Sequence, residues 1–377
     1  FDALSPHLQL IGGWKPGTGT LKVTKRATGE VVGSAAFSVE EQWEDANLGP
    51  SFCATGILQP PISHAAWGGG EPGPQNVSVY PAPAQWRVAI VLIDTTTNTF
   101  PTVAADLAAI QTNWANHFIN GVNVGGVTSS VAAYYNELSY GKMTMSLVGG
   151  AVTAPIHMTG TWEDNFDLET RPDPANPMVQ LPRRWNPKPG TWQTLVTTLE
   201  QANAVSSVVN LAATDAVVFV VRTANNPFAA NPPTGNSIGR FVWPQQLTED
   251  VTLSSGPRHL PMLVMPENWT ALDGRQIYET LAHELGHSLR LPDLYLYSYM
   301  NQGNAQRQID RWDLMDNDGG LPQMSLPSRM LLGWVPKNEV KSFNFAANGG
   351  GAIAETVTVQ ALEKTAIPAN SLRGVEV

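Results

Sequence analysis

Two histidines and a glutamate lie close together in residues 283–287, which read His-Glu-Leu-Gly-His. On a helix, residues four positions apart share one face. His283 and His287 can therefore offer two imidazole nitrogens to one zinc ion, and Glu284 can act as general base for a zinc-bound water. Residues 273–282 predict the required helix, because apolar residues recur there at helical spacing.

A catalytic zinc site needs a third protein ligand, with a fourth position left to water. Between Glu284 and Glu339 the sequence has no glutamate, and no histidine follows His287. Asp293 lies six residues after His287, and Pro292 disfavours helical geometry at the residue before it. A chain that turns back there could bring Asp293 onto the metal. The acidic candidates in this region are Asp293, Asp310, Asp313, Asp316 and Asp318.

This pattern resembles the extended zinc motif of the metzincin metalloproteases, His-Glu-x-x-His-x-x-Gly-x-x-His/Asp. The resemblance implies that Asp293 is the third zinc ligand and that Met315, within Trp-Asp-Leu-Met, belongs to the methionine turn beneath the metal. The family glycine corresponds to Arg290. If the turn needs a left-handed residue there, Arg costs about 1–2 kcal/mol. Alternatively the turn is built differently. If Asp293 is not the third ligand, Asp313 or Asp316 is the next candidate.

A narrower resemblance extends beyond the zinc motif. Residues 130–143, which include Tyr-Tyr-Asn-Glu-Leu, resemble an early segment of the immune inhibitor A family of secreted bacterial metalloproteases. The apolar run 88–94, residues 287–294 and the Leu-Leu-Gly-Trp of 331–334 also resemble that family, in the same order along the chain. The likeness covers roughly residues 86–336 and implies a secreted zinc endopeptidase that acts on proteins or peptides.

Strands and helices alternate along this region, and their order suits an α+β catalytic domain of zincin or metzincin type at 86–336, with a twisted mixed sheet and two long helices. We expect β-rich segments at 1–85 and 337–377, the second of which could be an incomplete domain. The expected strands are 88–94, 142–152, 216–222 and 259–265, and the expected helices before the zinc helix are 103–119, 127–138 and 192–211.

Two further parts of the chain carry weaker signals. Residues 21–24 and 30–39 predict two strands joined by a turn around Gly29. Residues 160–190 and 223–245 are rich in Pro, Asn and Trp and read as surface insertions, which line the substrate cleft in some proteases and are simple loops in others.

The composition narrows the class of partner. Of 377 residues, 42% are hydrophobic and only 14% are charged, against a typical quarter, as in many secreted proteins. The net charge of −10 disfavours nucleic acid and anionic membranes. No apolar run is long enough for a membrane span, and a single cysteine excludes an internal disulfide. We expect a secreted monomer.

Some smaller features leave alternatives open. The acidic turn 313–319 could hold calcium, although it lacks the full twelve-residue loop pattern, so we expect a solvated turn. Cys53 could cap the zinc and hold the enzyme latent, but its surroundings do not match the usual latency motif and favour a buried free cysteine. Asn76 and Asn268 begin glycosylation triplets.

Two other functions compete with the protease. Twelve tryptophans would suit a non-catalytic adhesion or carbohydrate-binding protein, yet such a protein has no need for a general base such as Glu284. A zinc hydrolase acting on a non-peptide amide would use the same chemistry, and only its substrate would differ.

Overall fold

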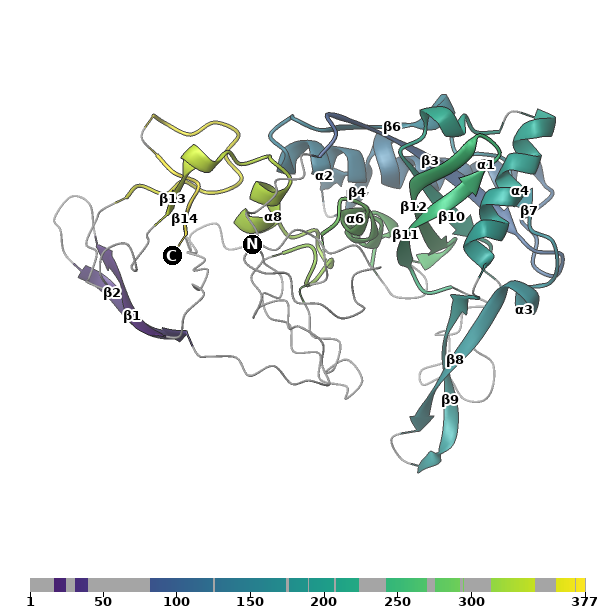
Figure 1. Ribbon diagram of the computed structural model, residues 1–377, viewed down its shortest axis with the longest axis horizontal. Coiled ribbons are helices and arrows are strands. Elements are labelled where there is room, and N and C mark those ends of the chain that lie inside the picture. Colours follow the sequence, from purple (N-terminus) through teal and green to yellow (C-terminus); the bar gives the residue numbers. More distant parts are fainter. Residues whose placement is uncertain are drawn as a thin grey trace.

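The structure is a computed structural model, which describes residues 17–24, 31–39, 82–124, 126–173, 176–188, 190–206, 208–223, 242–269, 275–291, 294, 313–342, 357–369 and 371–376. Several helices pack around a mixed β-sheet (Figure 1). The expected mixed α/β architecture is therefore confirmed at this level. The proposed division into three segments stays a prediction.

The central sheet has the strand order β11-β12-β10-β3-β6, and β7 also pairs with β3. All of these strands run parallel except β11, which lies antiparallel to β12 at one edge. The apolar runs predicted as strands make the sheet's centre, because a strand covered on both faces needs apolar residues throughout. Their bounds are β3 (Gln85–Asp94), β6 (Thr144–Leu147), β7 (Ile156–His157), β10 (Ala216–Val221), β11 (Gln245–Leu253) and β12 (Gly256–Pro266).

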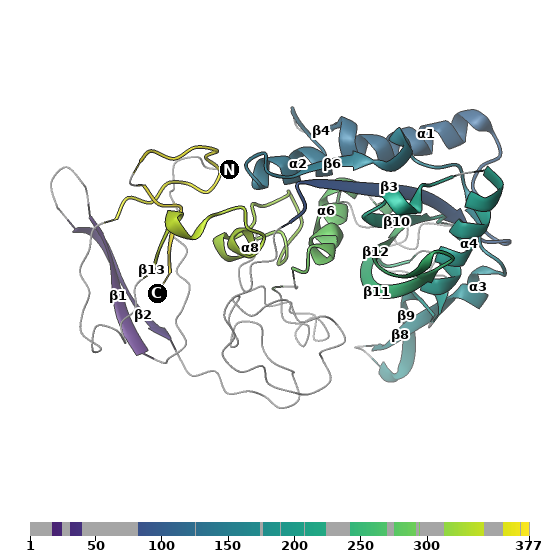
Figure 2. The same ribbon diagram turned by 45° about the horizontal axis from the view of Figure 1, so that its top comes forward.

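Successive residues of β3 point to opposite faces of the sheet, and each face has its own core. Figure 2 shows α1 and α4 on opposite sides of β3. Val88, Ile90 and Leu92 pack with the helices of the first face, which are α1 (Ala104–Ala115), the π-helical turn η2 (Asn116–Asn120), α2 (Val131–Leu138) and α6 (Ile277–Ser288). Ala89, Val91 and Ile93 pack with α4 (Thr191–Ser206) on the second face. The predicted zinc motif lies on α6 and therefore on the first face.

The helix expected at 127–138 begins later than the sequence indicated. Residues 122–129 instead form a short antiparallel hairpin of β4 (Val122–Val124) and β5 (Val127–Ser129). Ser130 then caps α2, since its side chain accepts a hydrogen bond from the Ala133 amide at 3.2 Å. The cap sets the helix start that apolar spacing alone could not locate.

Two other expected elements end early. The strand expected at 142–152 stops at Leu147, because Gly149 and Gly150 adopt left-handed conformations with φ of 74°. The helix expected at 192–211 stops at Ser206, and the Asn203 side chain accepts a hydrogen bond from the Val209 amide at 2.6 Å across the turn that follows.

The region 160–190 is not a simple loop. After the short helix α3 (Trp162–Asn165), it forms a long antiparallel hairpin of β8 (Phe166–Asp173) and β9 (Asn176–Pro187). Figure 1 shows this hairpin projecting away from the central sheet. Its base is anchored where the Trp243 amide donates to the Trp185 carbonyl at 3.2 Å. Most of the second expected insertion, 223–245, lies outside the described residues.

The remaining elements lie near the two ends of the chain. The N-terminal strands are confirmed as an antiparallel pair, β1 (Gly17–Thr24) and β2 (Val31–Val39). The C-terminal part contains α8 (Leu326–Leu331), the 3-10 turn η6 (Lys337–Glu339) and the parallel pair β13 (Val340–Ser342) and β14 (Gly374–Glu376). Among the helices that the structure describes, none is long and apolar enough to cross a membrane.

The C-terminal part is attached to the core around a buried arginine. Arg329 is completely buried and donates to the carbonyls of Leu138 at 3.3 Å and Leu362 at 3.2 Å, and to the Tyr140 hydroxyl at 2.8 Å. Tyr140 in turn donates to the Leu362 carbonyl at 2.7 Å. These contacts tie α8 to both α2 and the C-terminal segment.

Candidate functional site

Helix α6 carries the predicted zinc motif and is buried along most of its length, from Ile277 to Gly286. It begins after Gln276, whose amide donates to the Glu279 carboxylate at 2.6 Å in a capping box. The same carboxylate also accepts from the Gly320 amide at 2.7 Å. The start of the helix is thereby attached to the turn that contains the candidate methionine.

The two histidines lie on one face of α6, as their spacing predicted. Their ring centroids are 4.8 Å apart and the ring planes are at 90°. The Nδ1 atom of His283 is 2.8 Å from the Leu314 carbonyl oxygen, and that of His287 is 2.8 Å from the Leu291 carbonyl oxygen. A carbonyl can only accept, so each Nδ1 carries the hydrogen and the lone pair of the neutral ring lies on Nε2. This is the tautomer that a zinc-binding histidine commonly takes.

Glu284 follows His283 on the same helix. Each of the two residues has only 7% of its surface exposed. A glutamate in that position lies beside the two histidines without sharing their i, i+4 spacing. The role of Glu284 as general base stays a prediction.

The turn after α6 contains the left-handed residue that the metzincin motif implies. Arg290 has a φ of 70°. Its amide donates to the His287 carbonyl at 2.8 Å, and the Leu291 amide donates to the Gly286 carbonyl at 3.1 Å. These two bonds form a Schellman motif, which usually has glycine where this chain has Arg290. The alternative of a differently built turn is therefore wrong for the residues up to Leu291.

Met315 lies directly against α6, as the resemblance implied. It is completely buried. A Cβ atom added at Gly286 would lie only 2.6 Å from the Met315 sulfur and 3.4 Å from the Tyr135 hydroxyl. That hydroxyl donates to the Ala282 carbonyl at 2.7 Å. The glycine in the motif thus has a packing reason, because it lets Met315 and Tyr135 approach the helix.

The acidic turn is buried rather than solvated, which corrects the sequence prediction. Asp313 has no exposed surface. Its Oδ1 accepts from the Met315 amide at 2.8 Å, and its Oδ2 accepts from the Ser325 amide at 2.7 Å and the Ser328 hydroxyl at 3.4 Å. Burial raises the pKa of Asp313 above its usual value, although these hydrogen bonds act in the opposite direction. Protein donors thus hold both oxygens of Asp313, and its role as an alternative third ligand stays a prediction.

Asp318 is also held by protein groups. It pairs with Arg275 and accepts from the Thr280 hydroxyl at 2.6 Å. Burial acts to raise its pKa, but the positive charge of Arg275 and the hydrogen bonds from Thr280 and Arg275 lower it overall. Asp318 therefore links the turn to the first half of α6, and calcium at this turn stays an untested alternative.

The third zinc ligand stays a prediction, because Asp293 lies outside the described residues. Within the described ranges, no group of three or more His, Cys, Asp or Glu side chains is arranged to hold a metal ion. The residues that flank Asp293 are placed near the motif. The Leu291 carbonyl accepts from His287, and the Leu294 amide donates to the Met315 carbonyl at 2.9 Å.

The expectations for Cys53 as a buried free cysteine and for Asn76 as a glycosylation site remain untested, because both residues lie outside the described residues. Asn268 is exposed on the turn after β12, which is the position a glycosylation site would need.

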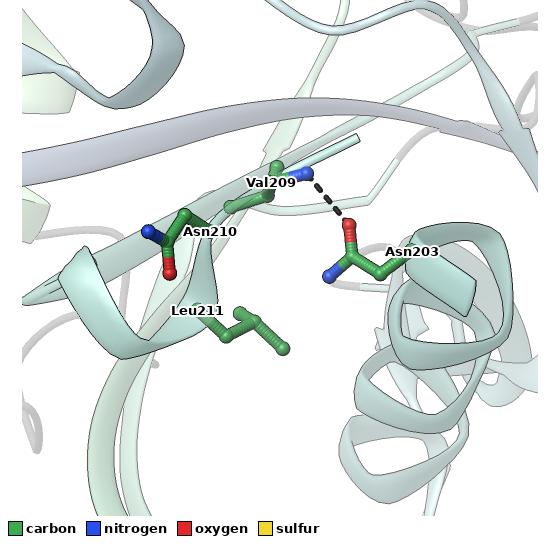
Figure 3. A pocket seen from close by; sticks show the side chains of 4 residues that line it. All are labelled: Asn203, Val209, Asn210 and Leu211. Carbon is green, nitrogen blue, oxygen red and sulfur yellow. Dashed lines mark hydrogen bonds between the residues drawn. The ribbon is translucent and has the colours of Figure 1, made fainter. Parts of the chain in front are cut away.

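A pocket of about 370 Å³ lies on the second face of the sheet (Figure 3). It is lined by Asn203, Val209, Asn210 and Leu211. Both asparagine side chains are already used within the chain, where Asn203 accepts from the Val209 amide and Asn210 accepts from the Ala213 amide at 3.3 Å. With no charged group in its lining, it has no evident link to the chemistry of α6.

Several residues that support the motif could not be found from the sequence. Tyr135 and Asp313 lay within segments that carried the family resemblance, but nothing in the sequence gave them a partner. Arg275 and Glu279 read only as polar positions of a helix start. A scan against protein-family models and a search of curated proteins find no match to the chain.

Proposed function

We propose that this chain is a secreted zinc endopeptidase of metzincin type, in which His283, His287 and Asp293 hold the metal and Glu284 is the general base. One observation carries the proposal. Two histidines on one helix face both have Nδ1–H committed to backbone carbonyls, so both present Nε2 as the basic nitrogen. Two histidine rings with chance spacing would have no reason to share this arrangement.

The chemistry follows from the types of these side chains. When bound, zinc supplies Lewis acidity toward water and toward the scissile carbonyl. Glu284 takes the proton from the attacking water and passes it to the leaving amine. Its low exposure suits a site from which bulk water is largely excluded.

The turn after α6 supports Asp293 as the third ligand. A left-handed residue in this position reverses the chain at the helix end, and Arg290 takes that conformation although it costs an L-residue about 1–2 kcal/mol. Strain of this kind persists where the surrounding structure requires it, and it is often found at functional sites. Reversal at Arg290 returns the chain toward His287 shortly before Asp293.

The fold and composition agree with the rest of the proposal. A mixed sheet with helices on both faces is compatible with a zincin catalytic domain. The low fraction of charged residues and the negative net charge suit a secreted enzyme acting as a monomer on protein or peptide substrates. Function rests on the site rather than on this architecture, which many unrelated proteins share.

The decisive experiment measures zinc content and casein hydrolysis on the same preparations. The wild-type chain is expected to bind about one zinc per molecule and to lose hydrolysis with phenanthroline. Glu284→Gln should keep its zinc and lose about 10²–10⁴-fold in rate. Asp293→Ala should lose zinc and activity together. Glu137→Gln, which alters an exposed glutamate on α2, serves as the matched control and should behave as wild type.

Different outcomes separate the competing functions. A wild-type chain without zinc, or a fully active Glu284→Gln, would refute the hydrolase mechanism. Hydrolysis of non-peptide amides alone would change the substrate class while keeping the site. Full zinc in Asp293→Ala would move the third ligand elsewhere, with Asp313 or Asp316 as the next candidate.

A further inference from the structure

One peptide group connects His283 to a buried carboxylate. The peptide between Leu314 and Met315 has two hydrogen bonds, one at each end. Its carbonyl oxygen, from Leu314, accepts from Nδ1 of His283 at 2.8 Å. Its N–H, from Met315, donates to Oδ1 of Asp313 at 2.8 Å. In a trans peptide these two groups point in opposite directions, so the carboxylate and the imidazole lie on opposite sides of one planar unit.

The connection is shielded from water. Asp313, Leu314 and Met315 are completely buried, and His283 is nearly so. The second oxygen of Asp313 is held by the Ser325 amide at the start of α8. The carboxylate therefore has a fixed place, and its hydrogen bond to the peptide is made in a region of low dielectric, where such bonds strengthen one another.

A carboxylate at the N–H end polarises the peptide group and makes its carbonyl a stronger acceptor. A stronger acceptor holds the hydrogen on Nδ1 of His283 more firmly and increases the basicity of Nε2. Metal-binding histidines commonly obtain this effect from a carboxylate in direct contact. Here the carboxylate acts from one peptide group further away.

The second histidine provides a contrast within the same site. His287 donates its Nδ1–H to the Leu291 carbonyl, which belongs to the peptide bond between Leu291 and Pro292. Proline has no N–H, so no carboxylate can act through that peptide. Any effect of this kind must therefore be confined to His283.

We propose that Asp313 is a positioning residue for His283, which acts through the Leu314–Met315 peptide to fix the Nδ1–H tautomer and strengthen Nε2 as a metal donor. The part that concerns zinc rests on the proposed function. The tautomer is a property of the metal-free chain and does not depend on it. A purely structural Asp313, which only closed the turn, would alter stability without a selective effect on one histidine.

The test compares wild type, Asp313→Asn and Ser328→Ala. Asn can keep an acceptor for the Met315 amide, but it removes the charge and places an NH2 group toward the Ser325 amide. Ser328→Ala removes the 3.4 Å contact to the other oxygen of Asp313 and the 3.1 Å contact between the Ser328 and Ser325 hydroxyls, and it leaves the charge of Asp313 in place. Nitrogen NMR of the metal-free proteins reports the tautomer of each histidine, and competition with a coloured chelator reports zinc affinity. Asp313→Asn should shift His283 toward the Nε2–H tautomer, leave His287 unchanged, and weaken zinc binding about 10-fold. Ser328→Ala should match wild type in both measurements.

The wild-type chain alone gives a second test, which covers the possibility that Asp313→Asn does not fold. His283 should be protonated at Nδ1 without metal, and the Met315 amide proton should lie far downfield because it donates to a carboxylate. A wild-type His283 protonated at Nε2, or a folded Asp313→Asn with unchanged tautomer and zinc affinity, would overturn the inference. A wild type that binds no zinc would refute the proposed function, and the tautomers would still decide the role of Asp313.

Discussion

Gly286→Ala should destabilise this protein, although the same change stabilises most helices. Gly286 lies inside α6 between Glu284 and His287, where alanine favours the helix by about 1 kcal/mol. The added Cβ would lie 2.6 Å from the Met315 sulfur, a separation that real Cβ atoms essentially never show, and 3.4 Å from the Tyr135 hydroxyl. Either helix α6 or the Met315 side chain must therefore move.

The size of the effect depends on whether Met315 can withdraw. Its side chain is flexible, but its backbone is fixed, because its amide donates to Asp313 and its carbonyl accepts from Leu294. Overpacking a core costs about 1–3 kcal/mol. After the helix preference of alanine, about 1 kcal/mol, is subtracted, we expect a net loss of up to about 2 kcal/mol in the free energy of unfolding.

Urea unfolding of a double-mutant cycle separates this clash from other effects. Met315→Ala alone should cost about 2–5 kcal/mol through the cavity it leaves. Combined with Gly286→Ala, it removes the obstructing side chain, so the double variant should be at least about 1 kcal/mol more stable than the sum of the single effects. Strictly additive effects of the two substitutions would show that Met315 does not pack against the helix as described.

Three further predictions concern the surroundings of α6. Arg290→Gly should be neutral or stabilise the protein by up to about 1 kcal/mol, because glycine adopts the left-handed backbone conformation without strain. Arg290→Val should destabilise it, because a β-branched residue tolerates that conformation poorly. A higher thermal unfolding temperature for the Val variant than for the Gly variant would contradict the left-handed turn. Burial lowers the pKa of His117 to about 4. In the unfolded chain this pKa is about 6.5, so the unfolded chain takes up the proton first as the pH falls. The free energy of unfolding should therefore decrease by up to about 3 kcal/mol between about pH 6.5 and about pH 4. Urea titrations at a series of pH values should show a smaller pH dependence of stability in His117→Phe. An unchanged pH dependence would mean that other groups cause it. Tyr135→Phe loses the 2.7 Å bond to Ala282 and should cost about 0.5–1.5 kcal/mol in the same assay, while an equally stable variant would mean that the bond contributes nothing.

The central sheet and the site helix could be predicted because their signals are local. The apolar runs of β3 and β10 are strands that sit between two covered faces, and the spacing in α6 places both histidines on one side. The hairpin at 166–187 could be predicted only as a surface insertion, because the Pro and Asn residues of this region usually mark turns. Its antiparallel pairing depends on contacts between residues that the local sequence does not reveal.

The chemistry of the acidic turn was hidden for a related reason. A run of aspartates near one another is usually solvated, since burying an unpaired charge is costly. Here the donors come from distant parts of the chain, with Arg275 and Thr280 before the turn and Ser325 after it. No local pattern shows which of these groups reach Asp313 and Asp318, so the buried state could be found only from the structure.

The parallel pairing of β3 with β10 has a consequence for the order in which the protein matures. Val88 pairs with Ala216 across a long stretch of chain, and sheets built from such distant pairings fold slowly. The acceptor for His283 comes later still, from Leu314, and its anchor from Ser325. During synthesis, a ribosome-bound chain that ends before these residues has the histidines of α6 but not the groups that orient them. If the chain is a protease, its catalytic centre is therefore among the last parts to assemble.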